Sequence, residues 1–149
     1  MRSTYRVLAY LVAVEVAVQA ATIVYFMTAM TKWVGDGASL TPALWNDSNS
    51  SFPGAQGLAI HWFNGLMLTP LLVLALVVVS FFAKVPQGTQ WALYVLGLLI
   101  LQIALAFIGS AVPLVSTLHG INALVLFSVT VMAGRRASTH TEVAQVAES

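Results

Sequence analysis

Long apolar runs separated by short polar breaks predict four membrane-spanning helices. A helix needs about 20 mostly apolar residues to cross the hydrocarbon core of a bilayer, and four segments have that length. We expect helices at about residues 5–30, 55–83, 89–109 and 112–134, with an outer loop at 31–54. The remaining links are short, so consecutive helices run antiparallel. The pattern predicts an all-α membrane protein folded as a four-transmembrane-helix bundle.

Composition agrees with this prediction and excludes several classes of site. Hydrophobic residues make up 59% of the 149 residues and charged residues only 7%, against roughly a quarter charged in soluble domains. We expect one transmembrane domain at 1–136 and a disordered cytoplasmic tail at 137–149, which is small and polar. The net charge of +1 provides no basic patch for nucleic acid. Without cysteine, the chain has no disulfide and no thiolate ligand.

The positive charges predict an orientation. The chain has six Lys and Arg residues, and all except Lys32 fall at one end of the predicted bundle: Arg2, Arg6, Lys84, Arg135 and Arg136. Cytoplasmic loops carry the excess of Lys and Arg in membrane proteins. We therefore expect a multi-pass protein of the bacterial inner (plasma) membrane with both termini in the cytoplasm.

A short motif occurs twice. Residues 61–68 read His-Trp-Phe-Asn-Gly-Leu-Met-Leu, and residues 119–126 read His-Gly-Ile-Asn-Ala-Leu-Val-Leu. The helices that precede these copies carry Gln19 and Gln102. The chain therefore reads as two helical hairpins in the same orientation, related by a pseudo-two-fold axis along the membrane normal. Such an internal repeat places His61 and His119 at one depth, facing each other.

Two facing imidazoles in a membrane bundle indicate a ligand site, because an unpartnered polar group in hydrocarbon costs several kcal/mol. We interpret the pair as the axial ligands of one haem b near the outer face. Two protein ligands suit haem, whose porphyrin fills the other iron positions, whereas zinc or copper normally takes a third or fourth ligand. The metal ligands would be His61 and His119, and small residues and amides around them complete the predicted site: Gly65, Ala123, Gly120, Asn64 and Asn122.

The second nitrogen of each ring then needs an acceptor, since metal-binding histidines usually donate their other N–H. Candidates are the backbone carbonyls one turn earlier, or Ser116 for His119. Glu15 is predicted to lie near mid-membrane, roughly a dozen or more ångströms too deep to be a ligand by helical rise. It is expected to face the bundle and to be protonated or paired with Gln19 or Gln102.

Two other classes of function stay open. Each histidine could instead hydrogen-bond a Gln, a Ser or a backbone carbonyl and bind nothing, as in a cofactor-free accessory subunit of a respiratory or transport membrane complex. Glu15 could act as a proton-relay acid in a quinone-binding or small transport protein. Whether the chain is an enzyme is open as well. Candidate partners are the lipid bilayer, a quinol, a larger respiratory complex and further copies of the chain, with no nucleic acid.

The chain resembles a family of small uncharacterised bacterial four-helix membrane proteins. These proteins have a Gln in helix one, a His at the start of helix two, and a Leu-His-x-x-Asn-Ala run followed by Arg-Arg after helix four. The corresponding residues here are Gln19, His61, residues 118–123 and residues 135–136. More loosely, the chain looks like the four-helix membrane b-type cytochromes, which ligate haem through helix histidines. Many of those hold two haems with four histidines, whereas only two histidines lie in the predicted membrane helices here. The resemblance therefore implies at most one haem, which would act in electron transfer.

Overall fold

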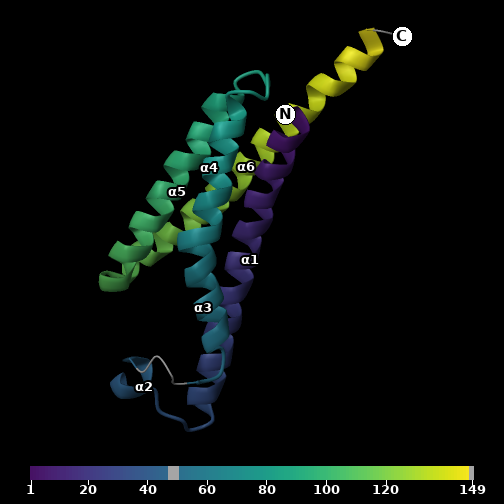
Figure 1. Ribbon diagram of the computed structural model, residues 1–149. Helices are drawn as coiled ribbons and strands as arrows, with labels where there is room; N and C mark the ends of the chain where they lie inside the picture. The colour runs from purple at the N-terminus through teal and green to yellow at the C-terminus, as the bar shows by residue number, and fades with distance from the viewer. Residues whose placement is uncertain (47–50, 148–149) are drawn as a thin grey trace.

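The structure, a computed structural model, describes residues 1–46 and 51–147, with side chains for 1–45 and 51–138. These residues form helices and no strand, and four helices are long and apolar enough to cross a membrane. Figure 1 shows the four as α1 (Arg2–Gly35), the continuous helix made of α3 (Ala55–Phe63), η1 (Asn64–Leu68) and α4 (Thr69–Ser80), then α5 (Gly88–Ala111) and α6 (Pro113–Ala147). A short helix, α2 (Pro42–Asn46), lies in the loop after α1.

The four predicted helices are present, each long and apolar enough to cross a membrane, and α1 and α6 extend several residues further than the sequence indicated. The helix α1 continues past residue 30 to Gly35, the first glycine after the apolar run. The helix α6 continues past residue 134 to Ala147, so the segment from 137 to 147, predicted as a disordered tail, is helical. That segment contains no proline or glycine, the residues that disfavour a helix most. Residues 47–50 of the predicted outer loop and 148–149 of the predicted tail lie outside the described residues.

The four helices surround a common centre. Contacts join α1 to α6 and to α3 and α4, and they join α5 to α6 and to α4. The helices α1 and α5 therefore occupy opposite corners of the bundle, as do α6 and the helix that runs from α3 to α4. This arrangement directs one face of each helix toward the same axis.

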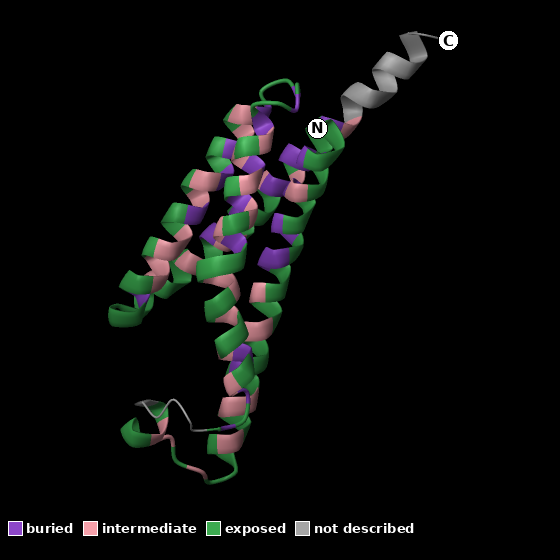
Figure 2. Cartoon of the chain, viewed as in Figure 1, coloured by how far each residue is buried: buried purple, intermediate pink, exposed green. Residues whose placement is uncertain are grey.

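The apolar core fills the half of the bundle that carries the N-terminus, where buried residues gather in Figure 2. Its members come from all four helices and include Tyr5, Ala9, Val12, Val73, Leu76, Val95, Leu126 and Ala133. Two contacts close this end: the Arg2 guanidinium donates to the carbonyl oxygen of Lys84 at 2.9 and 3.2 Å, and the Tyr5 hydroxyl donates to that of Gly88 at 2.9 Å. The core thus fixes the relative positions of the helices from one end.

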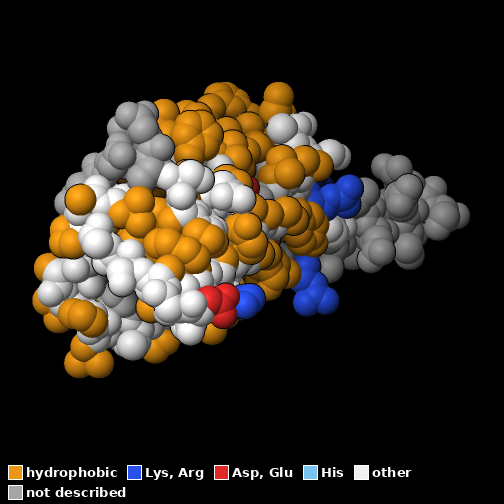
Figure 3. Space-filling view, turned by 90° about the horizontal axis from the view of Figure 1, so that it is seen from below, with side chains coloured by type: hydrophobic (Ala, Val, Ile, Leu, Met, Phe, Trp, Pro, Cys, Tyr) orange, Lys and Arg blue, Asp and Glu red, His pale blue; other side chains and the backbone are white. Residues whose placement is uncertain are grey.

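The opposite end carries aromatic rings. Phe26, Trp33, Trp45 and Phe52 form a cluster whose ring centroids are 6.1 to 6.4 Å apart. Lys32 and Asp36 form an exposed ion pair at 2.8 Å there. Figure 3, which views this end, shows a largely hydrophobic surface with few charges. Aromatic side chains at the end of an apolar bundle are typical of a membrane–water interface.

Gly57 allows α3 to pack directly on α1 and provides a test of this packing. A Cβ atom at Gly57 would lie 2.7 Å from the Thr22 carbonyl oxygen and 2.8 Å from the Tyr25 ring. We expect Gly57→Ala to lower the free energy of unfolding by about 1–3 kcal/mol through overpacking, measured by thermal unfolding in detergent. Gly97→Ala in α5 is the control, because a Cβ there meets nothing within 4 Å. An equal loss in both variants would contradict the close contact between α1 and α3.

Candidate functional site

The structure brings His61 and His119 together at the centre of the bundle. His61 lies on α3 and His119 on α6, and both side chains are half-buried. Their ring centroids are 6.4 Å apart, with an angle of 61° between the ring planes. Two residues that are far apart in the sequence therefore form one pair.

Both rings are held by a backbone carbonyl of a neighbouring helix. His61 Nδ1 lies 3.0 Å from the carbonyl oxygen of Gln19 in α1, and His119 Nδ1 lies 3.0 Å from that of Gln102 in α5. A carbonyl only accepts hydrogen bonds, so each of these two hydrogen bonds forms in the tautomer that has its proton on Nδ1 and its lone pair on Nε2. The expected acceptors, a carbonyl one turn earlier or Ser116, are not used. The Ser116 hydroxyl instead donates to the carbonyl oxygen of Gly109 at 3.1 Å.

A chain of hydrogen bonds extends from the second nitrogen of His119. The Gln102 side-chain amide donates to His119 Nε2 at 3.1 Å, and its oxygen accepts from the Asn122 amide at 2.6 Å. Asn122 is buried and also donates to the carbonyl oxygen of Leu98 at 3.0 Å. Asn122 therefore supports the site through Gln102 rather than through the ring itself.

Directly after His61 the helix contains a π-turn, η1, in which the Thr69 N–H bonds to the carbonyl oxygen of Asn64. The side-chain amide of Gln19 enters the helix at this turn. Oriented to satisfy both of its groups, it donates to the His61 carbonyl oxygen at 3.0 Å and accepts from the Gly65 N–H at 2.6 Å, and its nitrogen also lies 2.9 Å from His61 Nδ1. Insertion of a side chain into the helical hydrogen-bond ladder is a known cause of such interruptions. Pro70 lies just after this interruption, at the start of α4.

The other predicted site residues have different roles. A Cβ at Gly65 would lie 3.2 Å from the Gln19 amide, so Gly65 makes room for Gln19. Gly120 is exposed, and a Cβ there would meet nothing within 4 Å, so no other part of the described chain packs closely on it. Ala123 is half-buried and packs against the apolar core. Asn64 contributes its carbonyl to the π-turn, and its side chain forms no hydrogen bond among the described residues.

Glu15 faces the interior of the bundle, as expected, and of the two expected alternatives, protonation or pairing with Gln19 or Gln102, the pairing is absent from the described residues. Its side chain is only 8% exposed, and its Oε1 is the one buried side-chain polar atom without a hydrogen bond in the described part of the chain. Glu15 precedes Gln19 by one helical turn, about 6 Å of rise, so it lies closer to the histidines than the sequence suggested. Even so, no group of three His, Asp or Glu side chains that could hold a metal occurs among the described residues.

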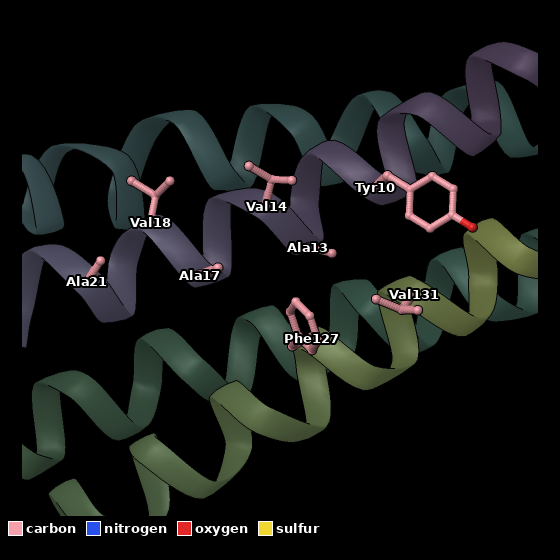
Figure 4. A pocket seen from close by; sticks show the side chains of 8 residues that line it. All are labelled: Tyr10, Ala13, Val14, Ala17, Val18, Ala21, Phe127 and Val131. Atoms are coloured by element: carbon pink, nitrogen blue, oxygen red, sulfur yellow. The ribbon is translucent and has the colours of Figure 1, made fainter.

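The exterior of the bundle carries an apolar groove between α1 and α6. It has a volume of about 630 Å³, and Figure 4 shows the side chains that line it: Tyr10, Ala13, Val14, Ala17, Val18, Ala21, Phe127 and Val131. Apart from the Tyr10 hydroxyl these side chains are apolar, so the groove suits an apolar surface. The histidine pair is therefore the stronger candidate for chemistry.

No family model, curated protein or solved structure matches the chain. The resemblance based on the histidine motifs stays a prediction, and the case for function depends on the geometry of the site.

The unpartnered carboxyl of Glu15 leads to a prediction about stability. A buried polar group without a hydrogen bond costs about 1–3 kcal/mol, so replacing it with an apolar side chain should remove that cost. We expect Glu15→Leu to raise the free energy of unfolding by about this amount, measured by thermal unfolding in detergent. Glu15→Gln, which keeps a polar group at the same position, should gain less. A loss of stability in Glu15→Leu would show that the carboxyl has a stabilising role.

Proposed function

We propose that the protein is a membrane b-type cytochrome-like protein that binds one haem between His61 and His119 and acts in electron transfer. The observation that carries this proposal is the 6.4 Å separation of the two ring centroids. A bond from a metal to an imidazole nitrogen is about 2 Å long. Adding about 1 Å from each nitrogen to its ring centre gives about 6 Å between two imidazoles that share one metal ion. The observed separation is close to that value.

The hydrogen bonds of the rings also support ligation. Metal-binding histidines usually donate their second N–H to a carbonyl or carboxylate, which sets the tautomer and the ring orientation. The Gln19 and Gln102 carbonyls fit this role, because each lies 3.0 Å from a ring Nδ1. Both rings then present the Nε2 lone pair. His61 Nε2 forms no hydrogen bond in the described part of the chain. His119 Nε2 accepts from the Gln102 amide, which a metal would have to replace.

A bound haem would supply reversible one-electron transfer, and two histidine ligands would disfavour oxygen chemistry. The chain's own residues would hold the rings through the two Gln carbonyls and keep Gln102 in place through Asn122. One haem cannot by itself span a core about 30 Å thick. The partner in this proposal is therefore a quinol, an external redox protein or a larger respiratory complex.

The same proposal includes an internal duplication of the helical hairpin and an orientation of the chain in the membrane. The two His–Gln contacts of equal length, one in each hairpin, favour a pseudo-two-fold relation between the hairpins. The cations at the end of the bundle that carries the N-terminus favour cytoplasmic termini in a bacterial inner membrane. The histidine pair would then lie toward the outer face.

A second candidate is a cofactor-free accessory subunit of a membrane complex. The hydrogen bonds from His119 through Gln102 and Asn122 to Leu98 are complete without a ligand, which favours this candidate. The apolar groove between α1 and α6, with Ala13, Ala17 and Ala21 along one side, would suit a neighbouring helix.

An optical spectrum of the detergent-purified protein, expressed with added haem precursor, tests the proposal. We expect a Soret band that shifts on reduction with dithionite, because two histidines would hold the iron in both oxidation states. The band should be lost in His61→Ala and in His119→Ala. His140→Ala is the control and should keep it. A colourless protein that folds normally would contradict haem binding and favour the accessory subunit.

A further inference from the structure

The buried residues of α4 show which side of this helix faces the interior, and the same side can be traced back along the helix to the residues around His61. Its buried residues are Thr69, Val73, Leu76 and Ser80. At about 100° per residue these four side chains point within about 60° of one another. Continued toward the N-terminus as a regular α-helix, the same face would pass through Gly65, Trp62 and Leu58. In that case Trp62, and not His61, would face the centre of the bundle.

The observed burial follows a different phase. Gly57 is buried against α1 and the His61 ring faces His119, whereas Trp62 is 44% exposed with its ring 6.0 Å from that of Phe107. His61 and Gly57 precede Thr69 by eight and twelve positions. The π-turn accommodates one extra residue, so His61 and Gly57 lie seven and eleven regular helical steps from Thr69. At about 100° per step, both residues then point to the same interior face as Thr69. The extra residue in η1 therefore determines which side chain faces inward.

The Gln19 amide occupies the place where a regular helix would close. The Gly65 N–H and the His61 carbonyl oxygen are four residues apart, so in an α-helix they would bond to each other. Here the amide of Gln19 lies between them and bonds to both, at 2.6 and 3.0 Å. In hydrocarbon an unpartnered N–H costs several kcal/mol. Without this amide, the Gly65 N–H would regain a partner only if the π-turn closed into a regular α-helical turn.

We propose that Gln19 is a positioning residue of the histidine site: its side-chain amide holds the π-turn open and thereby keeps His61, rather than Trp62, facing His119. Closure of the turn would rotate α3 by about 100° relative to α4. The second hairpin has no such device, because α6 is uninterrupted at His119 and the Gln102 amide bonds to the ring. The inference rests on the proposed function only where haem is used as the readout.

The test uses Trp62 as a reporter in a chain whose other three tryptophans, Trp33, Trp45 and Trp91, are replaced by Phe. Its fluorescence is measured in vesicles that contain brominated lipid, which quenches a ring exposed to lipid. We expect Gln19→Leu to reduce quenching because Trp62 turns into the bundle. Gln102→Leu is the matched control and should leave quenching unchanged.

A deletion separates rotation from general damage. Removing Met67, which is 53% exposed in η1, turns the π-turn into a regular turn without changing the phase on either side. Combined with Gln19→Leu, the deletion should restore the quenching of the parent protein, and the deletion alone should keep it. The proposal is overturned if Gln19→Leu leaves quenching unchanged, or if the deletion fails to restore it.

The same variants give a second readout in the haem-loaded protein. Gln19→Leu should lose the dithionite-shifted Soret band, and the added deletion of Met67 should recover it. If the parent protein binds no haem, the proposed function fails while the quenching of Trp62 still tests the role of Gln19. If the parent binds haem and Gln19→Leu changes neither readout, the role of Gln19 fails and the proposed function stands.

Discussion

The structure depends on the need of every polar group inside an apolar bundle to find a partner within the chain, because hydrocarbon supplies no water. This requirement explains why the two histidines lie where they do. Each Nδ1–H reaches a carbonyl of the helix beside it, at 3.0 Å in both hairpins. Asn122 satisfies the Gln102 side chain and the Leu98 carbonyl together. Glu15 is the exception among the described residues, and its unpartnered oxygen lies one helical turn from Gln19.

The apolar core and the histidine site occupy different parts of the bundle along its length. The half that carries the N-terminus contains a dense apolar core, closed by the Tyr5 hydroxyl on the Gly88 carbonyl. The histidine pair and the Gln and Asn side chains that support it follow toward the other end, where α3 packs on α1 through Gly57. Because the core fixes the four helices from one end, the histidines can face each other although they lie on opposite corners. The site is thus positioned by contacts that lie outside it.

The sequence predicted the four spans well because the length of an apolar run is a local property. The repeat also predicted a close histidine pair, and the Gln residues singled out beside it turned out to be the hydrogen-bond partners. The π-turn was missed because Gln19, which holds it, is more than 40 residues away in the sequence. A signal was nevertheless present, since His61 and Gly57 are out of phase with Thr69 and Val73 on a regular helix. The role of Gly120 beside a cofactor stays a prediction, although one residue after His119 is already about 100° around the helix.

The two hairpins use the same pair of residues in different ways, and the difference affects their chemistry. In the second hairpin the Gln102 amide covers His119 Nε2. In the first, the Gln19 amide bonds to the Gly65 N–H and the His61 carbonyl and lies 2.9 Å from His61 Nδ1, and His61 Nε2 has no hydrogen bond among the described residues. In the proposed arrangement the π-turn turns the His61 ring inward, and the Gln19 amide lies on the Nδ1 side of that ring rather than at Nε2. In the proposed haem site, a metal ion between the rings would meet one nitrogen without a hydrogen bond and one that first has to exchange a hydrogen bond, so His61 would be the first ligand to bind.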